Sequence, residues 1–288
     1  MTYAADVLDT ATYRAGAIVP HELRTERLSV AYPDGTRALQ HASLAFARAQ
    51  FTVLLGASGA GKSTLLRCLD GLVKPTTGRV LAPGLGDISQ PRTLRAHRRQ
   101  TGMVFQQHHL IGRLSVLSNV LTGRLAHRGS LATMLPWSRQ DRMLALAAID
   151  RVGLLDHALK RADELSGGQQ QRVGVARALV QAPRVMLADE PVASLDPATA
   201  ERLLSLLHGI CKSDGLTAVV SLHQVEFARR FADRIVGMAH GAVIFDGPPH
   251  QLTDDVVALL YGEPAPRALR EALLAAATLH QPPERAFT

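Results

Sequence analysis

The chain has 288 residues, of which 47% are hydrophobic and 20% charged, a composition that excludes an intrinsically disordered protein. Its length corresponds to one large domain or two of ordinary size. The net charge of +7 is local, because residues 88–140 hold eight arginines and no acidic residue. A uniformly basic coat for nucleic acid is therefore excluded, and one basic face is favoured.

The remaining bulk properties narrow the class of protein. Cys68 and Cys211 are the only cysteines, too few for a disulfide scaffold or a zinc module, so a reducing cytosol fits. No signal peptide is expected, because Asp6, Asp9 and Arg14 interrupt the apolar residues near the start. No apolar run approaches the ~18 residues of a membrane-spanning helix. Aromatic residues are only 4%, which argues against base-stacking platforms for nucleic acid.

The first part of the chain predicts short strands around a glycine-rich turn. We expect a poorly ordered leader at 1–20, strands at 27–32, 51–55 and 102–105, a helix at 62–69 and a turn-rich link at 72–78. Phe51-Thr-Val-Leu-Leu55 is a short, largely apolar run, which is typical of a strand buried on both faces.

From about residue 108 the strand runs disappear, and apolar residues recur at helical spacing. We interpret residues of about 108–180 as a helical subdomain inserted in a domain that spans 21–262. Strands and helices then alternate: strands at 185–188, 217–222, 234–238 and 242–245, helices at 170–180, 197–210 and 224–231. This alternation predicts an α/β fold with a mostly parallel sheet and helices on both faces. The remainder, 263–288, is expected to be a helical tail.

A glycine-rich loop follows the strand at 51–55 and fits the pattern G-x-x-x-x-G-K-[ST]. Its glycines let backbone N–H groups approach an anion, and the following helix start adds a favourable dipole. Lys62 supplies a charge to the β- and γ-phosphates of a nucleotide, and the Ser63 hydroxyl is a ligand for Mg²⁺. The expected nucleotide-binding residues are Gly56, Ala57, Ser58, Gly59, Ala60, Gly61, Lys62, Ser63 and Thr64.

Two carboxylates follow the strand at 185–188. Asp189 and Glu190 come at the carboxyl end of a parallel strand, which is the edge where such sheets bind ligands. Phosphoryl transfer to water needs a metal anchor and a group that orients or deprotonates the water. Asp189 suits the first role through a Mg²⁺-bound water, and Glu190 suits the second.

A second helix start is suited to binding an anion. Ser166 is a good N-cap, and Gly167 and Gly168 leave backbone N–H groups open before Gln169. An ordinary helix cap has the same pattern, so this segment alone leaves both interpretations open.

Taken together, the motifs resemble the ATP-binding subunit of an ABC transporter over about residues 24–250. They occur in that family's order, from the glycine-rich loop through five further segments: Gln106 after Phe105, Leu165-Ser-Gly-Gly-Gln-Gln-Gln-Arg172, Ala188-Asp-Glu-Pro191, Ser194-Leu-Asp196 and His223. The resemblance implies a P-loop ATPase core with an antiparallel β region near the N-terminus and an inserted helical subdomain.

The resemblance also implies roles for single residues. Gln106 would sense Mg²⁺ and the γ-phosphate beside the membrane subunits, so that Mg²⁺ is held by Ser63, Gln106 and Asp189. His223 would reach the γ-phosphate and hold the water-activating geometry, and Tyr32 would stack on adenine. The catalytic set would be Glu190, His223, Gln106 and Lys62.

The resemblance further implies a head-to-tail homodimer. The segment Ser166–Gln169 would contact the γ-phosphate held by the opposite protomer, and Asp196 would lie at the dimer interface. At Asp196, a carboxylate that stabilises a helix start beside Pro197 remains the alternative.

Four segments are most similar to phosphonate importers: Phe105–Leu110, Arg113–Arg124, Ala188–Pro197 and Ser221–Ala228. So is the insertion Leu131–Ser138, although His108-His109 stands where that family usually has a second aromatic residue. This resemblance implies ATP-driven phosphonate uptake through two membrane-spanning permease subunits, supplied by an extracytoplasmic solute-binding protein. The chain would lie peripherally on the cytoplasmic face of the inner (plasma) membrane, with no nucleic acid partner.

Other functions stay open at this point. Import of phosphite or another oxyanion, or a non-transport ABC ATPase that acts mechanically on an envelope complex, would use the same motifs. A DNA-acting member is disfavoured because Lys62 and Ser166 are about 100 residues apart without sustained heptads, and a translation-type member because only one cassette is present. The basic segment 88–140 is expected to meet the membrane subunits and anionic lipid headgroups, although a solvated arginine-rich face has the same composition.

Overall fold

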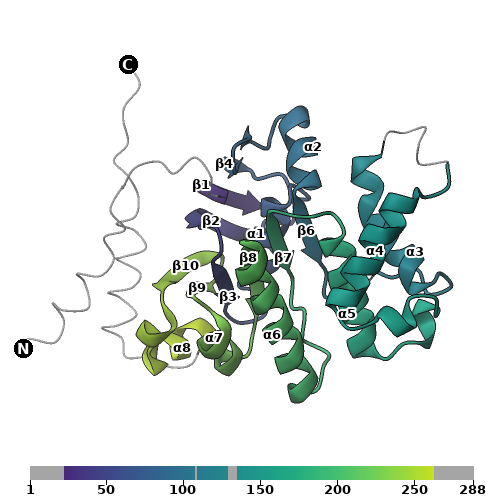
Figure 1. Cartoon of the computed structure of the whole chain (residues 1–288). Coiled ribbons are helices and arrows are strands. Elements are labelled where there is room, and N and C mark those ends of the chain that lie inside the picture. Colours follow the sequence, from purple (N-terminus) through teal and green to yellow (C-terminus); the bar gives the residue numbers. More distant parts are fainter. Residues whose placement is uncertain (1–22, 108, 129–134, 263–288) are drawn as a thin grey trace, which may run out of the picture.

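The structure is a computed structural model that describes residues 23–107, 109–128 and 135–262 (Figure 1). Four parts of the chain named above lie outside the described residues: the expected leader at 1–20, His108, the first part of the insertion at 131–138 and the tail at 263–288. Within the described part, no helix is both long enough and apolar enough to cross a lipid bilayer.

A six-stranded sheet forms the centre of the molecule, in the order β10-β9-β3-β8-β7-β6. Its strands are β3 (Phe51–Leu55), β6 (Thr101–Val104), β7 (Val185–Ala188), β8 (Thr217–Leu222), β9 (Arg234–Ala239) and β10 (Ala242–Gly247). All neighbours pair in parallel except β10, which pairs with β9 in antiparallel orientation. Every residue of β3, β6, β7 and β8 is buried, as expected for strands covered on both faces.

Helices cover this sheet on both faces (Figure 1), which confirms the predicted α/β fold. Val53 packs in one apolar cluster with residues of α6 (Pro197–Asp214), while the next residue, Leu54, packs in a second cluster with α1 (Lys62–Leu69). Alternate side chains of a strand point to opposite faces, so β3 joins the two clusters. Two further helices, α7 (Val225–Phe231) and α8 (Asp254–Tyr261), complete the carboxyl-terminal part.

A second sheet of four antiparallel strands contains the beginning of the described chain, as predicted. Its order is β2-β1-β4-β5, with β1 (Leu23–Ala31), β2 (Arg37–Phe46), β4 (Thr77–Ala82) and β5 (Gly86–Asp87). The pairings β2 with β1, β1 with β4 and β4 with β5 are all antiparallel. The sequence predicted only part of β1, while β2, β4 and the helix α2 (Pro91–Arg99) were not predicted.

Helices dominate between β6 and β7, and in Figure 1 they lie together beside the sheet. They are α3 (Val116–Leu121), α4 (Arg139–Arg151) and α5 (Gly167–Leu179), with 3₁₀ turns η1 (Thr122–His127), η3 (Leu155–His157) and η4 (Ala162–Glu164) between them. Val120, Ile149 and Val173, one from each helix, share an apolar cluster. The helix α4 starts at Arg139, because the Ser138 hydroxyl caps it by accepting from the Asp141 N–H.

Candidate functional site

The predicted site residues lie at one edge of the parallel sheet. The glycine-rich loop joins β3 to α1, Gln106 follows β6, Asp189 and Glu190 follow β7, and His223 follows β8. These four strands are parallel, so their carboxyl ends meet at the same edge, where ligands of such sheets bind.

Two glycines of the loop cannot be replaced without a clash. Gly56 has φ 150°, and a Cβ there would lie 2.1 Å from the Met238 carbonyl oxygen. Gly61, the N-cap of α1, has φ 101°, and a Cβ there would lie 2.4 Å from the Ala38 carbonyl oxygen. The loop is therefore pressed against backbone from two other elements, which holds its N–H groups at the start of α1, where an anion is favoured.

Lys62 is buried and lies across the loop that precedes it. Its Nζ donates to the carbonyl oxygens of Gly56, at 2.6 Å, and Ala57, at 2.9 Å. Burial lowers the pKa of Lys62, and the negative charges of Glu190 and Asp189 oppose that shift. The ammonium group is therefore held by the loop carbonyls and stabilised by the charges of the two carboxylates.

The structure brings together two of the three expected Mg²⁺ ligands, Ser63 and Asp189. The Ser63 hydroxyl, at the start of α1, donates to Asp189 Oδ1 at 2.8 Å. Asp189 is 5% exposed, and the same Oδ1 also accepts a 2.9 Å hydrogen bond from the Ser221 hydroxyl. An oxygen pair of hydroxyl and carboxylate suits a hard cation such as Mg²⁺. Sequence reasoning missed Ser221, which lies inside the mostly apolar strand β8.

Glu190 and His223 face each other at the end of β7 and β8. Glu190 Oε2 lies 3.6 Å from His223 Nδ1. The Tyr261 hydroxyl, from α8, donates to the His223 carbonyl oxygen at 2.6 Å. Burial, with smaller effects of Glu226 and Glu190, raises the pKa of Tyr261 to about 12, so this donor keeps its proton at neutral pH. Tyr261 is a second residue of the site region that sequence reasoning missed.

The segment Ser166–Gln169 forms a separate group with the start of α6. Ser166 caps α5, with Gln169 Oε1 accepting from the Ser166 N–H at 3.0 Å and completing a capping box. A Cβ at Gly168 would lie 2.8 Å from Thr199 Cγ2, so this helix start touches α6. Asp196 caps α6 through the Thr199 N–H at 3.0 Å. Hydrogen bonds from the Thr199 side chain and backbone lower the pKa of Asp196.

Tyr32 and Gln106 have different surroundings. Tyr32 is half-buried, and its hydroxyl lies 3.5 Å from Thr64 Oγ1, beside the helix that follows the loop. Gln106 is exposed, two residues after the end of β6. Tyr32 therefore lies beside the nucleotide loop and Gln106 lies at the sheet edge, and their contacts with a nucleotide remain predictions.

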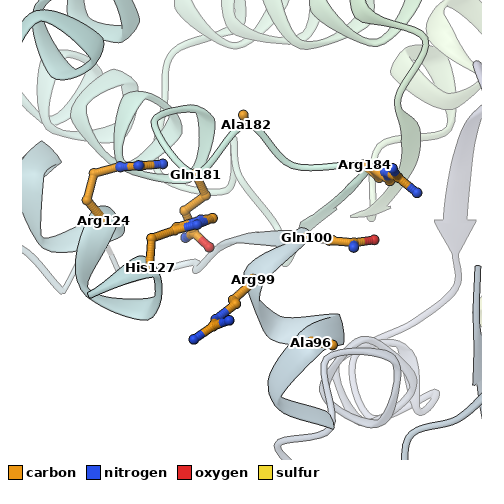
Figure 2. A pocket seen from close by; sticks show the side chains of 8 residues that line it. All are labelled: Ala96, Arg99, Gln100, Arg124, His127, Gln181, Ala182 and Arg184. Carbon is orange, nitrogen blue, oxygen red and sulfur yellow. The ribbon is translucent and has the colours of Figure 1, made fainter. Parts of the chain in front are cut away.

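A hollow of about 440 Å³ lies away from this site (Figure 2). Gln100 and Arg184 line it just before β6 and β7, so it is at the amino-terminal edge of the sheet, opposite the nucleotide loop. Two of its arginines are bound within the protein: Arg99 donates to the Ala126 carbonyl at 2.8 Å, and Arg124 pairs with Asp141 at 3.2 Å. Figure 2 shows the Arg99 and Arg184 side chains pointing away from one another, so they do not converge on one ligand.

Comparisons with known proteins agree with this geometry. Residues 39–193 match the family model described as "ABC transporter". A protein of Cupriavidus metallidurans named "Phosphonates import ATP-binding protein PhnC 2" is 62% identical over 242 residues, 84% of this chain and 87% of that protein. A protein of Stutzerimonas stutzeri named "Phosphite import ATP-binding protein PxtA" is 59% identical over 239 residues, 83% of this chain and 86% of that protein.

The fold is also similar to a solved ATP-binding cassette. That structure shows a dimer in a post-hydrolysis state, bound to ADP and Pi, and its chain has 33% identity and a TM-score of 0.70. The similarity covers 80% of this chain and all of that one.

Proposed function

The chain belongs to the family of ABC transporter ATPases, and we propose that it hydrolyses ATP to drive phosphonate import through separate membrane subunits. The observation that carries the chemistry is the 2.8 Å contact between Ser63 and Asp189 at the end of the phosphate loop. The 62% identical relative named for phosphonate import supports this substrate. The 59% identical relative named for phosphite import makes phosphite the second candidate.

Mg·ATP is the proposed ligand of the site. In the proposed arrangement the loop Gly56–Ser63 and Lys62 bind the phosphates, and Tyr32 stacks on adenine beside Thr64. Mg²⁺ would be held by Ser63 and Asp189, with Gln106 as a further contact, and it would neutralise charge on the β- and γ-phosphates. The paired hydroxyl and carboxylate of Ser63 and Asp189 support this assignment.

Glu190 is the proposed general base. It accepts a proton from the attacking water as that oxygen bonds to the γ-phosphorus and the bond to the β-phosphate oxygen breaks. In this proposal His223, whose Nδ1 lies 3.6 Å from Glu190 Oε2, keeps the carboxylate correctly placed relative to the γ-phosphate. Products are ADP and inorganic phosphate.

Two copies of the chain are proposed to form a head-to-tail dimer with two composite sites. The segment Ser166–Gln169 of one protomer would close over the γ-phosphate bound by the other. Gly167 is exposed at the start of α5, so its N–H group is open to an anion from outside the protomer, whereas the Ser166 N–H donates to Gln169. The solved dimer with ADP and Pi supports this arrangement.

The membrane side of the transporter is also part of the proposal. Two permease subunits would bind at the cytoplasmic face of the inner membrane, near Gln106, and a solute-binding protein outside would deliver the phosphonate. Partly exposed apolar side chains support such a docking face. They are Leu72 (49% exposed), which follows α1, and Ile111 (53%) and Leu114 (38%), which follow Gln106 in the sequence. The helices α3 to α5 would transmit dimer closure to the permease.

Replacing the proposed base tests the chemistry. Glu190→Gln should keep ATP binding and lose phosphate release by roughly 100-fold or more. The matched control is Glu201→Gln, a half-buried glutamate paired with Arg230, which should keep the wild-type rate. Hydrolysis at the wild-type rate in Glu190→Gln would exclude Glu190 as the base. Uptake of phosphonate, phosphite and phosphate by reconstituted transporter would then separate the substrates.

A further inference from the structure

A single buried hydroxyl connects the two carboxylate residues of the site. Ser221 is fully buried (0% exposed) in β8, between β3 and β7. Its Oγ donates to Asp189 Oδ1 at 2.9 Å and accepts from the Glu190 N–H at 2.8 Å. The hydroxyl therefore donates its proton to the proposed Mg²⁺ ligand, and its oxygen accepts the backbone N–H of the proposed base.

The backbone of Glu190 needs such support. Its φ is 45°, in the left-handed region that residues with a side chain rarely adopt. Strained conformations of this kind persist only where surrounding contacts determine them. The bond from the Glu190 N–H to Ser221 orients the peptide that joins Asp189 to Glu190, and hence the direction in which the Glu190 side chain leaves the strand end.

We propose that Ser221 is a positioning residue, whose hydroxyl holds the Mg²⁺-binding carboxylate of Asp189 and the general base Glu190 in one fixed relation. This inference rests on the roles proposed above for those two residues.

The two hydroxyls on Asp189 have different positions in the fold. Ser63 lies half-exposed at the start of α1, where the nucleotide is expected to bind, whereas Ser221 lies inside the sheet. If Ser63 and Asp189 hold Mg²⁺, the Ser63 hydroxyl would coordinate the cation and would no longer donate to Asp189. Ser221 would then be the hydroxyl that still donates to Asp189 Oδ1.

Only a side chain with both a donor and an acceptor at this point can make the two bonds. Ser221→Ala removes both and leaves a buried N–H without its acceptor, whereas Ser221→Thr keeps the hydroxyl. The matched control is Thr52→Val, which removes an equally buried hydroxyl from the neighbouring strand β3. Thr52 is 0% exposed, pairs with Val219 of β8, and bonds to Gln50 rather than to the site.

The first readout is turnover. Ser221→Ala should lower kcat roughly 10- to 100-fold, the range that a misplacement of about 1 Å costs, while KM for ATP changes less than about threefold. Ser221→Thr should recover most of the loss, and Thr52→Val should keep the wild-type kcat. A wild-type kcat in Ser221→Ala, or an equal loss in Thr52→Val, would overturn the proposal.

Two readouts do not depend on turnover. Amide hydrogen exchange at Glu190 should accelerate in Ser221→Ala and stay slow in Thr52→Val. The second readout is the ratio of the ATP affinity in Mg²⁺ to the ATP affinity in EDTA, measured in the Glu190→Gln variant. This ratio should fall about 10-fold when Ser221→Ala is added, because hydrogen-bond partners of metal ligands contribute that much to metal affinity. Unchanged exchange and unchanged Mg²⁺ dependence would also overturn it.

These results separate the two proposals. Wild-type hydrolysis in Glu190→Gln removes the proposed chemistry itself. An inactive Glu190→Gln together with a fully active Ser221→Ala removes only the role of Ser221.

Discussion

The Nε of Arg99 donates a 2.8 Å hydrogen bond to the carbonyl oxygen of Ala126, and so ties the end of α2 to η1. The preceding residue, Arg98, donates to the Gly71 carbonyl oxygen at 2.8 Å. Part of the acid-free segment 88–140 is therefore structural. Reversing these two charges would break packing as well as change the surface field.

Charge reversal one turn earlier tests the basic face without that complication. Arg92 and Arg95 are exposed on α2. Arg92→Glu with Arg95→Glu should weaken co-purification with the membrane subunits severalfold, more at low salt, and leave the melting temperature unchanged. Arg98→Glu with Arg99→Glu should instead lower stability by about 1–3 kcal/mol per lost charged hydrogen bond. Undiminished assembly of the Arg92/Arg95 variant at low salt would mean that the charge serves solubility.

Two glycines of the phosphate loop separate backbone strain from steric contact. Both have positive φ, 78° at Gly59 and 101° at Gly61, but only at Gly61 does a Cβ meet another atom, the Ala38 carbonyl oxygen at 2.4 Å. Gly59→Ala should cost about 1 kcal/mol of left-handed strain and keep ATP binding within severalfold. Gly61→Ala should move the start of α1 and abolish binding of a fluorescent ATP analogue. Equal affinities for the two variants would show that the contact with Ala38 does not shape the loop.

The strands that carry the site could be predicted because each is a short, mostly apolar run followed by a motif, as in β3 and β7. The strand β2 could not, since its residues Arg37–Phe46 include Ala, Leu, Gln and His, which have little strand preference by themselves. Its pairing with β1 and the burial of Leu39 and Leu44 decide its structure.

The site itself shows the same division. The proposed roles of Lys62, Ser63 and Asp189 follow from motifs, because each motif directly follows its own strand in the sequence. Lys62 and Ser63 end the loop after β3, and Asp189 follows β7. Ser221 comes 32 residues after Asp189, and its function arises only because β8 lies beside β7. A serine inside a mostly apolar strand carries no sequence signal of that pairing.

Asp70 carries a charge in an unfavourable place. It follows α1, is 8% exposed, and caps the carboxyl end of that helix, where a negative charge is disfavoured. Burial raises the pKa of Asp70 from 3.8 to about 7, while the positive charge of Arg98 opposes the shift. At neutral pH the folded protein therefore holds this carboxyl near its titration midpoint.

Replacing Asp70 should raise the free energy of unfolding above that of wild type at alkaline pH but not at acid pH. The native state keeps the proton up to about pH 7, while the unfolded state loses it near pH 3.8. The stabilisation from the protonated group is thus full below the unfolded pKa and is lost as pH rises to 7. Asp70→Asn, which cannot ionise, should exceed the wild-type free energy of unfolding by up to about 4 kcal/mol at pH 8 and match it near pH 4. Urea unfolding at both pH values measures this gap, with Asp150→Asn, an exposed position on α4, as control. A gap that is the same at both pH values would mean that Asp70 does not titrate in this range.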